Sequence, residues 1–205
     1  MEDAERLADI AIKLEWFRYN VIASLIWAMF GMVFGSALLF AGALQLIWNI
    51  SWTITSVMLV VAGIVGGYLF HKFWMFIPKE RVVKQRWRMG LLLMFIPFII
   101  TYALIPALTP LTSFYFSVIW YPSLGAGLLF SGLYVEKDSQ LAVRNLSFSG
   151  ALMLLSALAL IPISWLQPSD EVVLGANLLT ISMMIAIYLI ASLRGFFGAQ
   201  RVIQE

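Results

Sequence analysis

The sequence predicts an all-α fold, a polytopic bundle of six transmembrane helices. Hydrophobic residues make up 62% of the 205 residues and charged residues only 12%, against about 45–50% and about 25% in soluble domains. An apolar excess of this size cannot all be buried in a soluble core, so part of it must face lipid. At about 20 apolar residues per span, six spans with short connections nearly use up the chain.

The distribution of Lys and Arg predicts the orientation of this bundle. All thirteen basic residues lie at the two ends of the chain, or in or beside the longer connections 78–89 and 135–146. The short connections 48–52, 109–112 and 167–171 contain none. Because cytoplasmic loops carry the excess of basic residues, the sequence predicts that both termini lie in the cytoplasm. A plasma membrane is the expected location rather than an organelle, because the chain is compact and shows no evident transit segment.

The N-terminal segment 1–19 is expected to form an amphipathic helix at the membrane surface. Leu7, Ile10, Leu14 and Phe17 recur at three- and four-residue steps, which places them on one helical face. A short helical tail with no membrane role is the alternative. The acidic start and the long apolar run that follows differ from a signal peptide, so we expect this run to remain as an anchor.

The six spans follow within a transmembrane domain at 20–194, ahead of a cytoplasmic tail at 195–205. Each span is an apolar stretch bounded by polar or charged residues. The expected spans are 21–47, 53–77, 90–108, 113–134, 147–166 and 172–193.

Short internal matches are compatible with a 3+3 inverted repeat. Residues 35–42 and 125–132, in the first and fourth spans, share Gly, Leu, Leu, Phe and Gly at equivalent positions. Spans three and six share Tyr102/Tyr188, whereas spans two and five match poorly. An odd number of spans per unit makes the second unit inverted, as in many transporters. Chance similarity between apolar helices is the alternative.

Composition excludes several kinds of chemistry. The chain has no cysteine and a single histidine, His71, which rules out disulfides and thiolate metal sites. No charged residue lies at membrane depth in the expected spans, and Lys72 stands close enough to a boundary to reach the headgroups. Ion-coupled carriers usually keep charged groups there. We therefore expect no cofactor, no metal and no enzymatic activity.

Prolines inside the expected spans predict irregular helices and a polar path between spans three, four and six. An internal proline frees a backbone carbonyl, and in a membrane such groups must face protein or water. The alternative is that the hydroxyl groups only bond their own helix backbone. The polar side chains at comparable depth, which form the candidate polar path, are Thr101, Tyr102, Tyr121, Ser123, Asn177 and Thr180.

Small residues at four-residue spacing predict close helix packing. Packing within the chain is the preferred interpretation, and a homo-oligomer is the other. The candidate packing positions are Gly31, Gly35, Gly63, Gly67 and Gly127.

The connection after the second span holds the densest basic cluster. These side chains would meet anionic headgroups of the lipid bilayer or a cytoplasmic protein partner, or would only set the topology. Nucleic-acid binding is not expected, because one basic loop against a membrane is a poor footprint. The cluster consists of Lys79, Arg81, Lys84, Arg86 and Arg88.

The layout as a whole resembles the membrane subunits of small ABC-type permeases in architecture, though not in any motif. The resemblance implies a permease-like membrane subunit for transport or export that acts with a separate cytoplasmic partner. The alternative is a non-catalytic assembly, regulatory or lipid-interacting membrane protein. Because similar architectures serve different functions, both interpretations stay open from the sequence.

Overall fold

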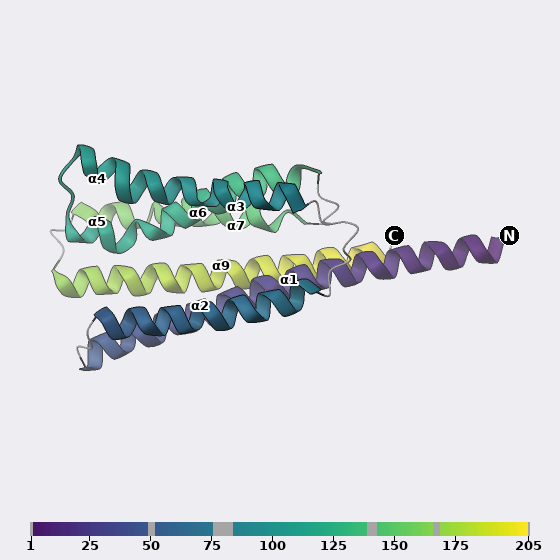
Figure 1. The fold of residues 1–205 in the computed structure, drawn as a ribbon, viewed down its shortest axis with the longest axis horizontal. Helices are drawn as coiled ribbons and strands as arrows, with labels where there is room; N and C mark the ends of the chain where they lie inside the picture. The colour runs from purple at the N-terminus through teal and green to yellow at the C-terminus, as the bar shows by residue number, and fades with distance from the viewer. Residues whose placement is uncertain (1, 49–51, 76–83, 139–142, 166–168, 205) are drawn as a thin grey trace.

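The computed structural model describes residues 2–48, 52–75, 84–138, 143–165 and 169–204. Within these ranges all regular structure is helical. Figure 1 shows long helical rods lying side by side, with successive rods running in alternating directions and both termini at the same end. The elements are α1 (Glu2–Trp48), α2 (Trp52–Met75), α3 (Lys84–Ile99), the π-helical turn η2 (Ile100–Leu104), α4 (Ile105–Leu108), α5 (Ser113–Val118), α6 (Trp120–Val135), the 3-10 turn η3 (Glu136–Asp138), α7 (Asn145–Ala157), α8 (Leu160–Trp165) and α9 (Asp170–Gln204).

Four stretches of the described chain are long and apolar enough to cross a membrane. They are Glu5–Gln45, Arg88–Leu108, Asn145–Trp165 and Asp170–Arg201, and α2 adds the shorter apolar stretch Val60–Leu69. An all-helical fold with several helices of this kind fits a membrane protein.

The first helix runs without a break through the segment for which the sequence predicts a separate surface helix. α1 continues from Glu2 to Trp48, and its first part projects beyond the rest of the bundle (Figure 1). Asn20, at the expected boundary, does not cap a new helix, because its side-chain Nδ2 donates back to the Trp16 carbonyl at 2.9 Å. Segment 1–19 is therefore continuous with the first rod.

Three of the rods are interrupted, and each interruption precedes a proline by a few residues. The proline ring clashes with the carbonyl four residues earlier and offers no N–H to it, which kinks or breaks a helix. This is the irregularity that the prolines predict. Pro97 is different, because it lies inside α3 without such an interruption. The interrupted positions are Ile100–Leu104 ahead of Pro106, Ile119 ahead of Pro122, and 158–159 ahead of Pro162.

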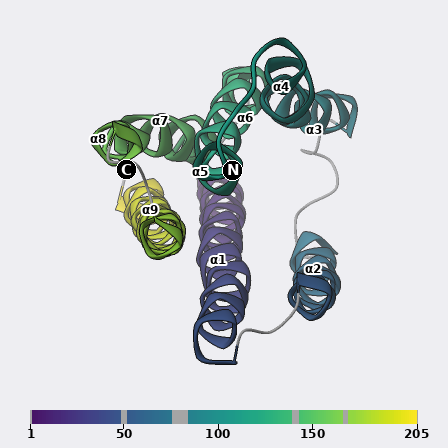
Figure 2. The ribbon, with the colours of Figure 1, turned by 90° about the vertical axis from the view of Figure 1, so that its left-hand side faces the viewer.

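Seen end on, the rods form an open ring (Figure 2). Around it α2 packs on α1, α1 on α9, α9 on α7, α7 on α6, and α6 on α3. The two ends of this series, α2 and α3, do not pack closely in the described chain, and their ribbons stand apart in Figure 2. The ring is thus open between α2 and α3.

Glycines allow the closest approaches between neighbouring rods. A Cβ at Gly31 would lie 3.1 Å from Tyr188 Cβ, and a Cβ at Gly35 would lie within 2.2 Å of Ile185 Cγ1, so α1 and α9 meet through these positions. Gly127 brings α6 against the α3 backbone in the same way.

Gly63 and Gly67 are predicted packing positions that do not meet a neighbouring helix in the described part of the chain. Nothing packs within 4 Å of a Cβ built at either one. The neighbouring Gly66 faces α1 instead, where a Cβ would stand 2.9 Å from the Phe34 ring. α2 is therefore rotated so that the Gly63 and Gly67 face points away from α1.

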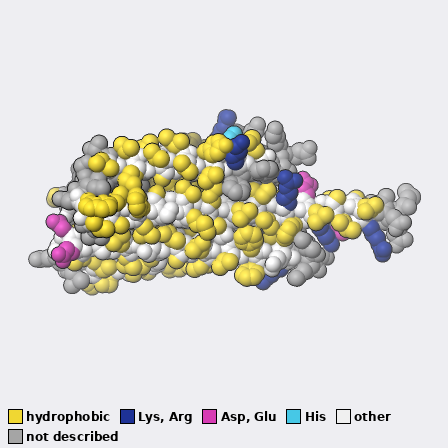
Figure 3. Space-filling view, turned by 90° about the horizontal axis from the view of Figure 1, so that it is seen from below, with side chains coloured by type: hydrophobic (Ala, Val, Ile, Leu, Met, Phe, Trp, Pro, Cys, Tyr) yellow, Lys and Arg dark blue, Asp and Glu magenta, His cyan; other side chains and the backbone are white. Residues whose placement is uncertain are grey.

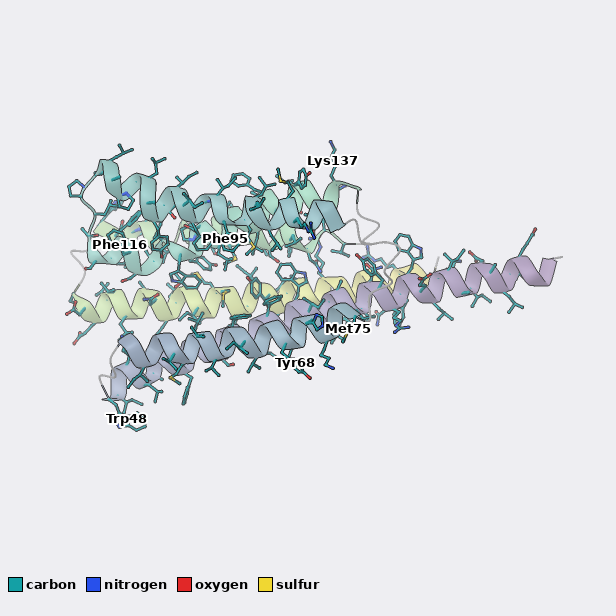
Figure 4. The ribbon with its side chains drawn as sticks, viewed as in Figure 1. Trp48, Tyr68, Met75, Phe95, Phe116 and Lys137 are labelled. Carbon is teal, nitrogen blue, oxygen red and sulfur yellow. The ribbon has the colours of Figure 1, made fainter. Side chains whose placement is uncertain are left out.

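The face of the bundle that Figure 3 shows is apolar along most of its length, and the charges on this face gather toward its ends. Asp170 and Glu171 open α9 at the end away from the termini. Figure 4 places Lys137 and Met75 at the end nearer the termini, and Trp48 at the opposite end. Near Met75, the Lys72 ammonium lies 5.6 Å from the centre of the Tyr68 ring. An apolar belt between charged ends is what a bilayer requires.

Candidate functional site

A partly enclosed cavity of about 620 Å³ lies inside the open ring. Its walls come from α1, α3, α6 and α9, with α7 and η3 contributing at one end. The volume falls within the roughly 300–1,000 Å³ typical of ligand pockets.

One face of α1 supplies most of the aromatic wall. Ala23, Trp27, Phe30, Phe34 and Leu38 all line the cavity, and their steps of three and four residues place them on a single helical face. The Phe30 and Phe34 rings stack with their centres 5.4 Å apart. This spacing is visible in the sequence, although it does not reveal that the face borders a cavity rather than a packed neighbour.

The wall opposite this face of α1 is also apolar. It contains Met94 of α3, Leu124 and Leu128 of α6, and Met184 and Tyr188 of α9. The Trp27 indole meets the Tyr188 ring edge to face, with the centres 5.2 Å apart. Methionine and aromatic side chains adapt to irregular apolar ligands, so the walls suit a hydrocarbon chain.

The end of the cavity nearer the chain termini is polar. We call it the polar end and define it by Asn20, Ser24, Glu136 and Asn145, which all line the cavity. These side chains are buried, with exposed fractions of 6% or less. The cavity therefore has a long apolar part and a short polar end, an arrangement that is complementary to an amphiphilic molecule.

Glu136 organises the polar end by capping α7. Its Oε1 accepts a hydrogen bond from the Leu146 backbone N–H at 2.7 Å, and its Oε2 accepts from the Ser147 N–H at 3.1 Å and from Ser147 Oγ at 2.7 Å. The first N–H groups of a helix have no partners within it and carry partial positive charge. The buried Glu136 side chain thus accepts hydrogen bonds from free backbone N–H groups in the first turn of α7.

Two buried polar atoms of α7 have no hydrogen-bond partner. They are Asn145 Oδ1 and Ser149 Oγ, one helical turn apart, and of the two residues only Asn145 lines the cavity. The neighbouring Ser24 hydroxyl donates to the Asn20 carbonyl at 2.7 Å. Most buried polar atoms in native proteins are paired, so these two atoms are exceptions at the start of α7.

The candidate polar path is not assembled as one channel lining. Thr101 and Ser123 come together, with their hydroxyl oxygens 2.8 Å apart. Tyr121 instead bonds Ser156 of α7 at 2.5 Å, and Tyr102 donates to the Phe116 carbonyl at 3.3 Å.

The α9 members of the path are also engaged in hydrogen bonds. Asn177 Oδ1 accepts from the Trp120 indole N–H at 3.2 Å, and Thr180 donates to the Asn177 carbonyl at 2.7 Å. Like the other members of the path, they do not belong to the cavity lining. Their bonds link neighbouring rods or satisfy the backbone of their own helix.

The basic cluster is only partly within the described chain. Lys79 and Arg81 lie outside the described residues, Lys84 and Arg86 belong to the first turn of α3, and Arg88 is exposed. Among the residues that the structure describes, no group of three His, Cys, Asp or Glu side chains is placed to hold a metal ion.

Comparison with known proteins leaves the site to be interpreted from its own geometry. No protein-family model matches the chain, and no curated protein or solved structure matches it either.

Proposed function

We propose that this chain is a six-span integral membrane protein that binds the hydrocarbon chain of a lipid inside its bundle. The observation that carries the proposal is the cavity wall, which is apolar from Leu38 to Trp27 along α1 and is polar only at one end. Lipid tails are the apolar ligands that a bilayer supplies in excess. The sequence left a lipid-interacting membrane protein as one interpretation, and the cavity is the binding site that we propose for it.

Two further rods support a count of six spans. α2 has 24 residues, and at about 1.5 Å per residue it is about 36 Å long. The rod Ser113–Val135 keeps helical backbone angles at Ile119, where α5 meets α6, and is about 35 Å long. Both rods match the about 30 Å thickness of the hydrocarbon core. Together with the four membrane-length stretches they make six.

The way into the cavity also favours a lipid over a soluble ligand. The ring is open between α2 and α3, and both helices carry exposed apolar side chains, such as Ile64 and Leu92. An acyl chain can enter sideways there without leaving the hydrocarbon. An empty apolar cavity forfeits dispersion contacts, so occupancy by a chain stabilises the bundle.

One observation favours transport as a second candidate function. A 3+3 repeat pairs α1 with α5–α6, α2 with α7–α8, and α3–α4 with α9. The contacts of α1 with α2 and α9 then correspond to those of α6 with α7 and α3, whereas the contact between α7 and α9 has no close counterpart between α2 and α3. The matching contacts support an inverted repeat and a permease-like subunit. This role predicts a nucleotide-hydrolysing cytoplasmic partner that co-purifies with the protein. Replacing the five basic residues of the cluster by Glu should release it.

The lipid proposal is tested by filling the cavity. In native mass spectrometry of the purified protein, we expect the wild type to retain one lipid-sized adduct. Ala23→Phe places a ring in the cavity and should remove the adduct. The matched control is Leu25→Phe, because Leu25 is 38% exposed and belongs to α1 but not to the cavity lining. Equal adducts on all three proteins would count against the proposal.

A further inference from the structure

The cavity is nearly as long as the hydrocarbon core of a bilayer is thick. Along α1 its lining runs from Asn20 to Leu38, which at about 1.5 Å per residue is about 27 Å. Along the opposite wall the lining runs from Trp120, where α6 begins, to Glu136, its C-cap, which is about 24 Å. The two walls agree to within about one helical turn, and the hydrocarbon core measures about 30 Å.

The cavity is also narrow. Dividing its volume of about 620 Å³ by the length of about 27 Å gives a mean cross-section of about 23 Å². A hydrocarbon chain whose atoms stay about 4 Å from their neighbours needs about 20 Å². The cavity therefore holds one extended chain, and two chains lying side by side do not fit.

The polar end is where the head group of such a lipid would lie, and helices enclose it on several sides. The lining there comes from α1, η3, α7 and α9. Two chains that start from one head group at this place would have to enter the apolar part together. Because the apolar part has the width of one chain, the walls fit a lipid with a single chain.

The apolar part of the cavity also limits the length of the chain. It runs from Ala23 to Leu38 on α1, which is about 22 Å. An extended hydrocarbon chain advances about 1.3 Å per carbon, because its bonds of about 1.5 Å follow a zigzag. About 18 carbons therefore fill the apolar part, and a shorter chain leaves wall atoms without contacts.

Leu38 stands at the end of the apolar part that is farther from the chain termini. Among the described residues of α1 it is the last that lines the cavity. Its half-buried side chain packs against the buried core of the bundle, so its position is fixed by its neighbours. The size of the side chain at position 38 then decides how far a chain can extend.

We propose that the cavity binds one single-chain lipid in an extended conformation, with its head group at the polar end and the end of its chain against Leu38. The proposal rests on the lipid-binding function proposed above and adds the class of lipid and a chain length of about 18 carbons. Leu38 is the residue that determines this length.

Monoacylglycerol and diacylglycerol test the number of chains, because they share a neutral glycerol head group and can carry the same acyl chain. Both, with saturated 18-carbon chains, are added in equal amounts to the purified full-length protein in detergent, and adducts are measured by native mass spectrometry. We expect an about tenfold stronger monoacylglycerol adduct, because a diacylglycerol must leave one chain outside the wall contacts. Equal adducts, or a stronger diacylglycerol adduct, would overturn the single-chain assignment.

Monoacylglycerols with 14, 16, 18, 20 and 22 acyl carbons test the length. We expect the wild-type adduct to be strongest near 18 carbons and about tenfold weaker at 14 and at 22, because the shorter chain leaves wall unfilled and the longer chain cannot enter completely. An adduct that does not depend on length, or that increases steadily to 22 carbons, would overturn the length assignment.

Variants of α1 assign the length to one side chain. Leu38→Trp should move the preferred length down by about two carbons and Leu38→Ala up by about two, which is the reach of the atoms added or removed. Leu25→Trp is the matched control, because Leu25 is 38% exposed and lies on the same helix but does not line the cavity. An unchanged preference in both Leu38 variants would overturn the role of Leu38.

The outcomes separate this proposal from the function on which it rests. If no monoacylglycerol of any length forms an adduct with the wild-type protein, lipid binding itself is overturned. Adducts without a preference for one chain or for one length overturn the single-chain assignment and leave lipid binding standing. The two wild-type comparisons decide the matter even when a Leu38 variant does not fold.

Discussion

The Cα of Gly127 on α6 lies against the backbone of Met94 on α3, so that a Cβ at Gly127 would stand 2.5 Å from the Met94 carbonyl oxygen. Real Cβ atoms do not come this close to an oxygen, and a backbone carbonyl cannot rotate away as a side chain can. The contact therefore sets the distance between these two rods, as small residues do in membrane helices.

Gly127→Ala is expected to destabilise the protein by about 1–3 kcal/mol, the usual cost of overpacking. The matched control is Gly67→Ala, where nothing lies within 4 Å of the added Cβ and alanine is the better helix former by up to about 1 kcal/mol. Unfolding by SDS, followed by circular dichroism, measures both. Equal stability of the two variants would contradict the packing described for α3 and α6.

The cap on α7 makes Glu136 a second stability determinant. Glu136→Gln keeps the size but turns an NH₂ group toward donors that the carboxylate now satisfies. Hydrogen bonds to charged groups contribute about 1.5–3 kcal/mol each, so we expect a loss of a few kcal/mol and a lower midpoint in a thermal-shift assay in detergent.

Glu171→Gln is the control for this loss. Glu171 also stands in the first turn of a helix, α9, but is exposed, so its interaction with the helix dipole contributes about 0.3–1 kcal/mol. A Glu136→Gln variant as stable as Glu171→Gln would show that the buried carboxylate is not needed to start α7.

Several ends of the rods could be predicted from the sequence, because they follow local apolar runs. The C-terminal end of α9 could not: the helix continues to Gln204, through most of the expected tail 195–205 and beyond the expected end of the span at 193. The expected span 53–77 and the observed α2, Trp52–Met75, differ by two residues at most. The breaks ahead of Pro106, Pro122 and Pro162 were accessible for the same reason, since a proline acts on the turn before it. The continuity of α1 through residue 20 could not be predicted in this way. A change in the apolar pattern shows where the surroundings of a helix change, but it does not show whether the helix ends there.

Which side chains line the site depends on how each helix is rotated about its axis. The position of a residue along a span, which the sequence indicates, does not reveal this rotation. Thr101 and Ser123 were expected at comparable depth on a shared path, and in the structure their hydroxyl groups contact each other and do not line the cavity. Trp27 and Phe34 share a face by spacing, but the spacing does not show that this face borders a cavity. Glu136 accepts a hydrogen bond from Leu146, ten residues later in the chain and across a loop. No short sequence motif predicts such a contact.

The bond between Thr101 and Ser123 distinguishes a structural pair from a transport path. A double-mutant cycle of Thr101→Val and Ser123→Ala, measured by SDS unfolding, should give a coupling of about 0.6 kcal/mol and at most about 1.7. Ser182→Ala is the control partner, because its hydroxyl bonds the Leu178 carbonyl within α9 and should show no coupling to Thr101→Val. Zero coupling between Thr101 and Ser123 would reopen their assignment to a polar path.

The topology itself can be read with single cysteines, since the chain has none of its own. Thr109 and Ser169 lie at one end of the bundle, in connections without Lys or Arg, whereas Ser139 lies in the charged connection 135–146. Exactly one rod, Ser113–Val135, separates Thr109 from Ser139, and one more, Asn145–Trp165, separates Ser139 from Ser169. The three positions therefore test whether each rod crosses the bilayer.

In intact cells, a membrane-impermeant maleimide should label Thr109→Cys and Ser169→Cys, and should reach Ser139→Cys only after the membrane is opened. This result follows if basic loops stay in the cytoplasm. The reverse pattern would invert the orientation and keep the spans. Labelling of Thr109→Cys and Ser139→Cys from the same side would show that the rod interrupted ahead of Pro122 does not cross, because a rod that crosses must leave its two ends on opposite sides. The count of six spans would then fail.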